Sequence, residues 1–471
     1  MAVDSTTSAR MRDDALRLFR EPDPRPVHFV GIAGAGMSAL AELFVRRGVT
    51  VTGSDMSPAG NADLEALGVT VHRGHDAAYV RGARAVVVSS AIPADHVEMV
   101  EAGALRLPVI RRAEALGAAV AGMQIVGIAG THGKTTTTVM TTEALAGTSA
   151  APTGIVGGRV HRWGGNLRWG GGTTVVVEAD EYDRSFLALH PTIAVVTNVE
   201  ADHLDIYTDL RDIVATFEAY LAEAHGVVLC ADDPGANALA VPAQAELIRY
   251  GTDTPDARLV GIVEGDAMRI VFDGAPLGTL TLRVPGQHNR RNALAAIGAG
   301  LMLGHSFDAL KPGLEAFVGV ERRFERKGEV HGVLVIDDYA HHPTEVRATL
   351  EAARAAFPGR RIVALFQPHL YTRTRDFADD FGQALAAGTD CFALTDIYKA
   401  REHPIPGVTS TLIADAADRA GHAPDWLGSR RDATPALLAL VRPGDVVLTM
   451  GAGDVTAVGP ELLEALSARS A

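Results

Sequence analysis

The sequence predicts an α/β protein with mostly parallel sheets and more than one domain. Short apolar segments alternate along the chain with longer segments of helical composition, which is the pattern of repeated strand–helix units. Two glycine-rich turns each stand between an apolar segment and a helical one. The length of 471 residues exceeds what one ordinary hydrophobic core supports, so we expect two or three domains.

The first domain is expected over residues 27–122, after an N-terminal extension of residues 1–26. Its predicted elements are strand 27–33, helix 37–45, strands 49–53 and 85–89, and a small apolar link over 117–122 into the second domain. Strand, glycine-rich turn and helix follow one another at its start, which is the order of a Rossmann unit.

The second and third domains are expected over residues 123–326 and 327–471. In the second domain we predict strands 123–128, 174–178, 193–197 and 226–230, helices 135–145 and 289–303, and loops or an edge hairpin within 154–172. In the third domain we predict strands 332–336, 361–366, 391–395 and 445–449, alternating with helices. Ligands of such sheets bind outside the carboxyl ends of the strands, so functional side chains are expected there.

Composition and charge exclude several classes of function. Hydrophobic residues make up 47% and charged residues 21% of the chain, as in globular domains. The formal charge of −14 and the lack of a basic run argue against a nucleic-acid partner. No apolar stretch suits a membrane span or a signal peptide, so a cytoplasmic location is expected. Cys230 and Cys391 lie in apolar segments, which predicts buried free thiols.

The first glycine-rich turn has the pattern of a pyrophosphate site. Gly34, Gly36 and Ser38 lie in a G-x-G-x-x-A turn, and Asp55 follows the second strand. This pattern suits a dinucleotide or a nucleotide sugar, and the turn alone does not separate NAD from a UDP-sugar. A tight turn without a ligand is the other interpretation.

The second glycine-rich turn, residues 127–136, is a candidate site for a nucleoside triphosphate. Two residues separate Gly130 from Gly133, whereas the standard P-loop has four before its Gly–Lys pair, so this loop is a variant. Its glycines let backbone N–H groups surround phosphate oxygens, and the helix N-terminus adds positive potential. Lys134 can reach the β- and γ-phosphates, and the Thr135 hydroxyl can join the ligands of Mg²⁺.

Acidic residues and a histidine follow two further strands of the second domain. Four carboxylates lie within residues 178–183, where they would repel one another unless a cation is near. Glu178 is nearest the end of the strand, so we assign it to Mg²⁺. His203 can be a neutral imidazole ligand of a second metal ion. A solvated acidic loop and a structural histidine are the alternatives.

Amide and basic groups near the second domain boundary suit a nucleotide. Asn289 and Asn292 lie where an alanine-rich helix begins, and amides there can read the edge of a purine ring. Asn289 can also cap this helix. Arg323 lies near the boundary, where a guanidinium can stabilise phosphoryl charge held by the neighbouring domain.

Two segments of the third domain combine histidine with charged residues directly after predicted strands. The segment 337–345 contains Asp338, Tyr339 and His341, and the second contains His369 and Arg373. Their histidine and arginine content suits anionic substrate groups. The chain has no G-x-S-x-G elbow and no H-E-x-x-H motif, which argues against the corresponding hydrolases.

Together these motifs resemble the Mur ligase family, the ATP-dependent amide-forming enzymes of peptidoglycan precursor synthesis. The loop G-T-H-G-K-T-T at residues 130–136 is similar to the family's G-T-x-G-K-T/S-T loop. The resemblance continues through E-A-D-E-Y-D from residue 178, N-V-E-A-D-H-L-D from 198, R-R-F-E from 322, D-D-Y-A-H-H-P-T-E from 337 and Q-P-H-L-Y-T-R-T from 367. It implies a Rossmann-like N-terminal domain, a central P-loop-type ATPase domain and a Rossmann-like C-terminal domain.

The resemblance also implies an activity, its substrates and its cofactors. ATP would phosphorylate the lactyl carboxylate of UDP-N-acetylmuramate, and the amine of L-alanine would attack the acyl phosphate. Mg²⁺ is the implied metal ion, with Mn²⁺ as an alternative. No nucleic acid and no membrane span are expected, and the chain is expected as a monomer or a weak homodimer.

The resemblance implies which residues bind each substrate. The expected catalytic residues are Lys134, His203, Arg323 and His341. ATP would be bound by Gly130, Thr131, His132, Gly133, Lys134, Thr135, Thr136, Asn289, Asn292, Arg323 and Asp338. The UDP-sugar would be bound by Gly34, Gly36, Ser38, Asp55, Ser89 and His132. The amino acid would be bound by Tyr339, His369 and Arg373, and the metal ions by Thr135, Glu178 and His203.

Three other functions stay open from the sequence. A recycling ligase of the same family attaches a preformed peptide to the same UDP-sugar, and its acidic motif is similar to residues 178–183 here. The segment 337–345 favours the alanine-adding branch. An NAD-dependent oxidoreductase would explain the first glycine-rich turn but gives Lys134 no role. A nucleotide-gated binding protein would use the same loops without chemistry.

Overall fold

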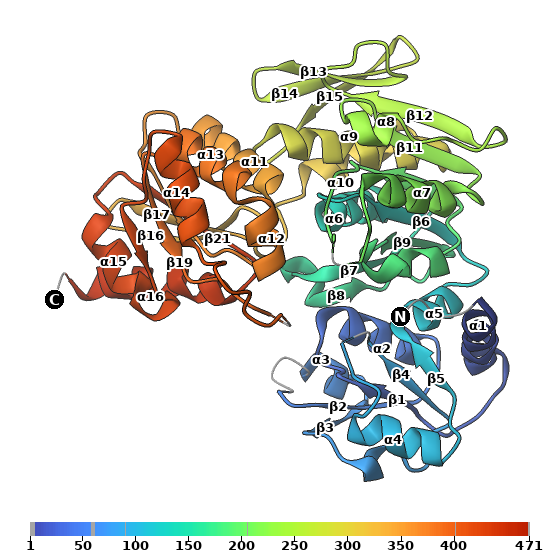
Figure 1. The fold of residues 1–471 in the computed structure, drawn as a ribbon. Coiled ribbons are helices and arrows are strands. Elements are labelled where there is room, and N and C mark those ends of the chain that lie inside the picture. The colour runs from blue at the N-terminus through green and yellow to red at the C-terminus, as the bar shows by residue number, and fades with distance from the viewer. Residues whose placement is uncertain (1–4, 58–61, 90, 205, 401, 470–471) are drawn as a thin grey trace. The chain divides into compact units, whose positions relative to one another are not determined.

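The computed structural model describes residues 5–57, 62–89, 91–204, 206–400 and 402–469, with side chains from residue 11 onward. The chain divides into two compact units. The first comprises Met1–Leu282 and Arg291–Phe317, and the second comprises Arg283–Arg290 and Val318–Ala471. Among the described residues, the first unit contains two sheets and the second contains one (Figure 1).

The N-terminal sheet is parallel, with its strands in the order β3-β2-β1-β4-β5. The strands are β1 (Val27–Val30), β2 (Val51–Asp55), β3 (Thr70–Arg73), β4 (Ala85–Val88) and β5 (Val109–Arg111). The helices are α1 (Ser5–Arg20), α2 (Ala35–Arg46), α3 (Ala62–Ala66), α4 (Val97–Ala104) and α5 (Arg112–Ala119), with the 3₁₀ helix η1 (Ala77–Val80). The strand order reverses beside β1, which is where a Rossmann-type sheet binds its ligand.

One prediction for this domain was wrong in part. Residues 117–122 were expected to be a link, but α5 extends to Ala119, and residues 120–122 form the turn before the next strand. Alanine makes up four of the eight residues of α5 and has the highest helix propensity, so the helix continues through Gly117. Helix α1 was not predicted either, and it packs on α5.

The central sheet has the order β15-β14-β13-β12-β11-β10-β6-β9-β7-β8. Its strands are β6 (Gln124–Ala129), β7 (Thr153–Val160), β8 (Gly165–Arg168), β9 (Thr174–Glu178), β10 (Ile193–Val196), β11 (Gly226–Cys230), β12 (Glu246–Gly251), β13 (Leu259–Glu264), β14 (Ala267–Phe272) and β15 (Ala275–Thr281). The helices are α6 (Lys134–Ala146), α7 (Leu210–Leu221), α8 (Pro234–Asn237), α9 (Gln287–Met302) and α10 (Phe307–Glu315), with the 3₁₀ helices η2 (His161–Trp163) and η3 (Tyr182–Ala188).

Strand β6 lies between β9 and β10, and both pairings are parallel. The carboxyl ends of these three strands therefore meet at one edge, as predicted. The predicted edge hairpin is also present, since β7 and β8 pair antiparallel at one end of the sheet. The antiparallel strands β13 to β15 were not predicted, and they extend the opposite end (Figure 1).

The C-terminal sheet has the order β16-β17-β21-β18-β19-β20, and β16 is antiparallel to its neighbour. Its strands are β16 (Glu325–Val330), β17 (Val333–Asp338), β18 (Ile362–Phe366), β19 (Cys391–Thr395), β20 (Trp426–Gly428) and β21 (Val446–Met450). The helices are α11 (Pro343–Ala356), α12 (Tyr371–Asp376), α13 (Ala378–Gly388), α14 (Thr411–Arg419), α15 (Ala433–Leu440) and α16 (Val458–Ala468), with the 3₁₀ helices η4 (Arg430–Asp432) and η5 (Asp454–Ala457).

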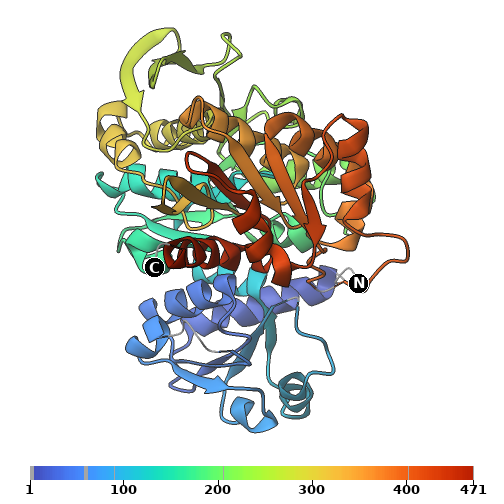
Figure 2. The same cartoon turned by 90° about the vertical axis from the view of Figure 1, so that its left-hand side faces the viewer.

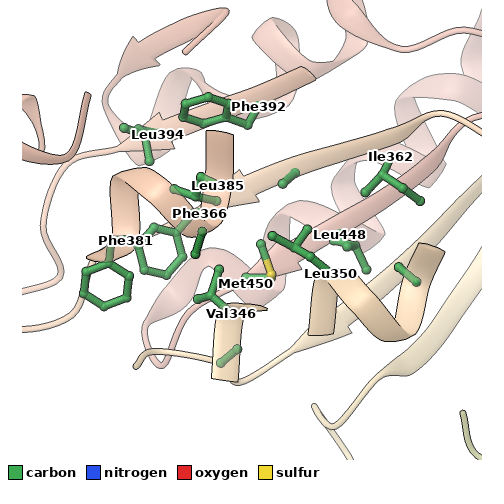
Figure 3. Packing of buried hydrophobic residues seen from close by; sticks show 14 of the residues in the cluster. Val346, Leu350, Ile362, Phe366, Phe381, Leu385, Phe392, Leu394, Leu448 and Met450 are labelled. Carbon is green, nitrogen blue, oxygen red and sulfur yellow. The ribbon is translucent and has the colours of Figure 1, made fainter. Parts of the chain in front are cut away.

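Both faces of the C-terminal sheet are covered by helices (Figure 2). Alternate residues of a strand point to opposite faces, so Ile362 and Phe366 pack under α11 and α13, while Val363 and Leu365 pack on the side of α15 and α16. Figure 3 shows the first of these layers, where the ring of Phe366 lies beside Phe381. Burial on both faces explains why these strands read as continuous apolar runs in the sequence.

Both cysteines are buried free thiols, as predicted. Burial raises the pKa of Cys230 to about 11 and that of Cys391 to about 12, so neither is a thiolate at neutral pH. Among the described residues, no helix combines the length and the apolar composition needed to cross a membrane.

Candidate functional site

The loop between β6 and α6 is shaped by two glycines. Gly130 has a φ of 135° and Gly133 a φ of 81°, both in the region that side chains disfavour. A Cβ on Gly130 would lie 2.1 Å from Oγ1 of Thr197, and one on Gly133 would lie 2.9 Å from Oδ1 of Asn292. The loop therefore needs glycine at both positions, and Asn292 lies directly against it.

The segment after β10 holds this loop in place. The backbone N–H of His132 donates to Oδ1 of Asn198 at 2.7 Å, and Nδ2 of Asn198 donates to the carbonyl of His132 at 3.0 Å. Oγ1 of Thr197 donates to the same carbonyl at 2.6 Å. No role was predicted for Thr197 or Asn198 from the sequence. Their signal was their position directly after a strand that neighbours β6.

Lys134 is buried at the start of α6. Its Nζ donates to the carbonyl of Gly130 at 2.7 Å and to that of Thr131 at 3.2 Å, and it lies 2.8 Å from Oε2 of Glu181. Burial lowers the pKa of Lys134, but the surrounding carboxylates outweigh this and hold the pKa above its ordinary value. Lys134 is therefore a fixed positive charge held against the backbone of the phosphate loop.

Glu181 is the partner of Lys134, and it was not among the site residues predicted from the sequence. Burial raises the pKa of Glu181 to about 7, although the charge of Lys134 opposes this rise. Glu181 is therefore the member of the pair that gains or loses a proton near neutral pH. The signal for it was the run of four carboxylates after β9.

Thr135 and Glu178 are brought together by α6 and β9. Oγ1 of Thr135 donates to Oε1 of Glu178 at 2.8 Å, and Oε2 of Glu178 accepts from the backbone N–H of Gly157 at 2.7 Å. A hydroxyl and an oriented carboxylate beside a phosphate loop are the oxygen ligands that Mg²⁺ prefers. These two residues therefore fit a nucleotide-bound magnesium ion.

His203 lies beside the carboxylates of Glu181 and Asp202. Its Nε2 is 3.9 Å from Oε1 of Glu181 and 3.8 Å from Oδ2 of Asp202, and its ring packs edge-on against Tyr182. Its backbone has a φ of 53°, which is uncommon for a side-chain-bearing residue. The structure therefore places His203 at the acidic segment, where it adjoins the Lys134–Glu181 pair.

The first glycine-rich turn is tied to the end of β2 by Asp55. Oδ2 of Asp55 accepts from the backbone N–H of Ala33 at 3.0 Å, and Oδ1 accepts from that of Ser57 at 3.0 Å. Ser89 follows β4, which pairs with β1, so it lies at the same edge of the sheet.

The glycines of the first turn lie at the start of α2. Gly34 caps this helix, and the Ser38 hydroxyl donates to the carbonyl of Ala35 at 3.0 Å. A Cβ on Gly36 would lie 3.0 Å from Nη1 of Arg112, the first residue of α5. Arg112 is thus a cation beside the turn to which the sequence analysis gave no role.

In the second unit, Asp338 fixes the turn that carries Arg323. Its Oδ2 accepts from the backbone N–H of Phe324 at 2.7 Å, and its Oδ1 accepts from that of Ala340 at 2.8 Å. Burial raises the pKa of Asp338 to about 6, against the charge of Arg323. The guanidinium of Arg323 lies 5.1 Å from the ring centroid of Tyr339, within the range of a cation–π contact.

The remaining predicted residues of the second unit form one cluster. Nδ1 of His341 lies 3.0 Å from the carbonyl of Tyr339, and its ring centroid lies 5.7 Å from that of His369. Nδ1 of His369 lies 3.2 Å from Nη1 of Arg373. Glu402, which the sequence analysis did not assign, accepts from the backbone N–H of Thr372 at 3.1 Å at the start of α12.

Asn289 lies in the first turn of α9, where its Nδ2 donates to the carbonyl of Pro285 at 2.6 Å. It belongs to the second unit, whereas Asn292 belongs to the first. The two asparagines proposed for the purine therefore belong to different units.

Comparison with known proteins assigns the chain to a family. Three family models match it: the Mur ligase family catalytic domain over residues 26–123, the Mur ligase middle domain over 128–300, and the Mur ligase glutamate ligase domain over 322–453. The chain is also 47% identical to the UDP-N-acetylmuramate–L-alanine ligase of Salinibacter ruber, over 94% of this chain and 95% of that relative. The chain belongs to the Mur ligase family.

Other relatives and solved structures of Mur ligases agree. The UDP-N-acetylmuramate–L-alanine ligase of Arthrobacter sp. is 49% identical over 94% of this chain and 96% of its own length. A crystal structure of the UDP-N-acetylmuramate–alanine ligase of Thermotoga maritima is 28% identical, with a TM-score of 0.79 over 94% of this chain and 100% of that one. The murein peptide ligase of Psychrobacter arcticus is 25% identical, with a TM-score of 0.69 over 94% and 98%.

These findings confirm the predicted Mur ligase resemblance and the predicted α/β class with three sheet-containing domains. In this Mur ligase, the phosphate loop, the Thr135–Glu178 pair and the cluster around His341 each occupy a strand end, as predicted. The exact domain boundaries and the role of each site residue stay predictions.

Proposed function

We propose that this Mur ligase joins L-alanine to the lactyl carboxylate of UDP-N-acetylmuramate in an ATP-dependent step of peptidoglycan precursor synthesis. The observation that carries the proposal is the identity of 47% to a ligase named for these substrates, over nearly the full length of both chains. The buried Lys134 at a glycine-rich phosphate loop supports the use of ATP. ATP and a nucleotide sugar as substrates place the proposed reaction in the cytoplasm.

The reaction needs activation because a carboxylate at neutral pH is a poor electrophile. Transfer of the γ-phosphoryl group of ATP to a carboxylate oxygen yields an acyl phosphate and ADP. The amine of L-alanine then attacks the carbonyl carbon, loses a proton and expels phosphate, which leaves an amide. Fixed positive charge around the transferring group supplies most of such catalysis.

Within the central domain, Lys134 has the task of neutralising phosphate charge. In the proposal, the phosphates of ATP replace Glu181 as the partner of its ammonium group. Thr135 and Glu178 would hold Mg²⁺, with His203 at a second ion and Mn²⁺ as an alternative. When bound, such an ion would neutralise negative charge on the phosphates. Thr131, His132 and Thr136 would complete the loop around the phosphates.

The other substrates are assigned to the remaining sites. The turn at Gly34, Gly36 and Ser38 suits the pyrophosphate of the UDP-sugar because it opens α2 at the switch point of the sheet. The UDP-sugar would also meet Asp55, Ser89 and His132. Tyr339, His341, His369 and Arg373 suit the amino acid and the reacting carboxylate, since these aromatic and basic groups lie in one cluster. Asn289, Asn292, Arg323 and Asp338 would complete the ATP site.

A panel of amine substrates in an ADP-release assay tests the proposal. With ATP, Mg²⁺ and UDP-N-acetylmuramate, we expect ADP release that depends on L-alanine. Release with a preformed peptide but not with L-alanine would favour the recycling ligase, a candidate supported by the likeness to the murein peptide ligase. Oxidation of NADH without ADP release would favour an oxidoreductase. Analytical ultracentrifugation over a range of protein concentrations would test the proposed monomer or weak homodimer. A constant monomer mass indicates a monomer, and a mass that falls on dilution indicates a weak homodimer.

A further inference from the structure

The N-terminal domain contains a cluster of metal-ligating side chains that the ligase chemistry does not use. We call it the histidine–glutamate cluster, and it comprises His28, His75, His96 and Glu98. His75 follows β3, His96 caps α4, and Glu98 lies in the first turn of α4, while His28 lies in β1. Glu98 and His28 are fully buried, and His75 keeps 17% of its side chain exposed.

The geometry of three of these residues matches a coordination sphere. One nitrogen of His75, one nitrogen of His96 and one carboxylate oxygen of Glu98 all lie within 4.8 Å of one another. Nδ1 of His75 is 3.0 Å from Oε1 of Glu98, and the rings of His75 and His96 lie edge to face with centroids 4.5 Å apart. These atoms converge from two different elements, the end of β3 and the start of α4.

Surrounding groups orient the carboxylate. Nε2 of His28 lies 3.1 Å from Oε2 of Glu98, and the Ser54 hydroxyl donates to the same oxygen at 2.8 Å. His28 is held in turn by Oγ1 of Thr52, 3.0 Å from its Nδ1. Oε2 is thus occupied by protein partners, and Oε1 faces His75. Outer partners that fix the orientation of a ligand are typical of metal sites.

His96 gives a second, independent indication of a bound ion. Its Nδ1 is buried, and within the described part of the chain it has no hydrogen-bond partner. Although His96 stands at the N-cap of α4, its side chain makes no capping hydrogen bond. A buried imidazole nitrogen without a partner costs free energy, and a bound ion at this cluster would offset that cost.

We propose that His75, His96 and Glu98 bind a transition-metal ion of the zinc class. Two imidazole nitrogens and one carboxylate suit Zn²⁺, Co²⁺ or Ni²⁺, whereas Mg²⁺ prefers oxygen ligands alone. Three protein ligands leave a fourth position for water or another group. The site is separate from Thr135 and Glu178 and does not depend on the proposed ligase activity.

An ion at this site would cross-link the end of β3 to the start of α4. It would act on the carboxyl edge of the N-terminal sheet, where Asp55 and the first glycine-rich turn also lie. Because the three ligands are assembled in the folded domain and not in the unfolded chain, the ion would raise the unfolding temperature, by an amount that grows with the logarithm of the ion concentration divided by its Kd.

The experiment uses the full-length chain without a histidine tag, stripped with a chelator and kept in excess MgCl₂. ZnCl₂ binding is measured by competition with a chromophoric chelator, and CoCl₂ binding by visible absorbance. The variants are His75→Gln, His96→Gln and the double variant H75Q/H96Q. His72→Gln is the matched control, because His72 lies in the same domain and stacks on Tyr79 outside the three-residue site.

We expect the wild type and His72→Gln to bind one high-affinity Zn²⁺ more than the double variant. Loss of an outer partner typically costs about 10- to 100-fold in metal affinity, so each single variant should lose at least that much. Equal zinc affinity in the wild type and the double variant would overturn the proposal and leave a hydrogen-bonded network only.

Histidine footprinting keeps the test decisive if the double variant fails to fold. Carbethoxylation of the wild type is mapped by mass spectrometry with and without ZnCl₂. Protection of His75 and His96 by zinc, with no change at His72, supports the site. Unchanged modification of His75 and His96 contradicts it.

Discussion

The phosphate loop after β6 and the glycine-rich turn after β1 both connect a strand to a helix, but different interactions hold each of them in place. In the phosphate loop, a buried lysine pairs with a buried carboxylate, two glycines adopt positive φ, and Asn198 in the segment after β10 hydrogen-bonds the loop backbone. In the N-terminal turn, one carboxylate, Asp55, bonds the backbone, and Gly34 has an ordinary φ of −60°. The phosphate loop is organised by buried charge and packing, and the N-terminal turn by backbone hydrogen bonds.

The difference bears on how each loop meets a ligand. Charges that are already fixed cost little to reorganise when a phosphate binds, so the phosphate loop suits a reacting group. A turn held through its backbone can accept a non-reacting group such as a pyrophosphate. Substitutions in the phosphate loop should therefore change kcat most, and those in the N-terminal turn should change KM for the UDP-sugar.

The largest effect is expected from Lys134→Ala. Removing a preorganised charge from the transferring group should lower kcat for ADP release by about 10²- to 10³-fold or more. We expect the fold to survive, because Glu181, with a pKa of about 7, can take up a proton when its partner is lost. Lys311→Ala, which removes a partly exposed lysine from the same unit, is the control and should keep full activity. Normal turnover by Lys134→Ala would remove the loop from the mechanism.

Replacing one glycine in each loop tests the packing difference directly. Gly130→Ala forces a Cβ to 2.1 Å from Thr197 Oγ1 at a φ of 135°, so a loss of roughly 3 kcal/mol in the free energy of unfolding is expected. Gly34→Ala meets only ordinary contacts of 3.5 Å or more and should lose less than about 1 kcal/mol. Urea unfolding of both variants provides the measurement.

Gly147→Ala controls for the residue change itself, because a Cβ there meets no atom within 4 Å and φ is −84°. Equal losses in the Gly130 and Gly34 variants would contradict the distinction between the two loops. If Gly34→Ala folds normally but raises KM for the UDP-sugar, the ligand itself must approach the backbone closely at Gly34.

Much of this contrast lies outside what residue patterns can reveal. Both loops are visible in the sequence because strand, glycine-rich turn and helix follow in order, and the strands covered on both faces read as apolar runs. Glu181 could not be singled out from four neighbouring carboxylates, because burial and its distance from Lys134 depend on tertiary packing. Asn198 and Arg112 were missed for the same reason.

The antiparallel strands β13 to β15 escaped prediction through a different cause. Their burial is irregular: β13 changes from buried to exposed half-way along, and β15 is mostly exposed. Proline and glycine also interrupt β15, so the local sequence pattern is weak. The helical part of the link expected over 117–122 was missed because small residues suit both a loop and a packed helix, and packing against neighbours such as α1, α2 and η3 decides between the two.

An intermediate effect is expected from the pH dependence of the buried pair. The pKa of Glu181 in the folded protein is about 7, above the ordinary value of 4.5, so the unfolded chain releases this proton first as the pH rises. Its contribution to stability is therefore complete below pH 4.5 and is lost as the pH rises through 7. The size of this loss is about 3 kcal/mol by linkage.

Glu181→Gln isolates this contribution, because glutamine cannot ionise. Urea unfolding at pH 4.5 and pH 8 should show the wild type losing about 3 kcal/mol relative to the variant between these values. Asp338, whose pKa is also raised, is present in both proteins and cancels in the comparison. A stability gap that does not change with pH would mean that Glu181 stays ionised beside Lys134.

The smallest effect is expected from Asp55→Asn in the N-terminal turn. Both oxygens of Asp55 accept backbone N–H groups at 3.0 Å, whereas asparagine has only one accepting oxygen, so one bond is lost. The expected cost is about 1 kcal/mol in unfolding free energy, with KM for the UDP-sugar raised by up to about 10-fold. Asp76→Asn is the control, because Asp76 accepts from the backbone N–H of Ala78 at 2.8 Å in the same domain but away from the turn. A fall in kcat at saturating UDP-sugar would place Asp55 among the groups that act on the reacting centre and so erase the contrast between the two loops.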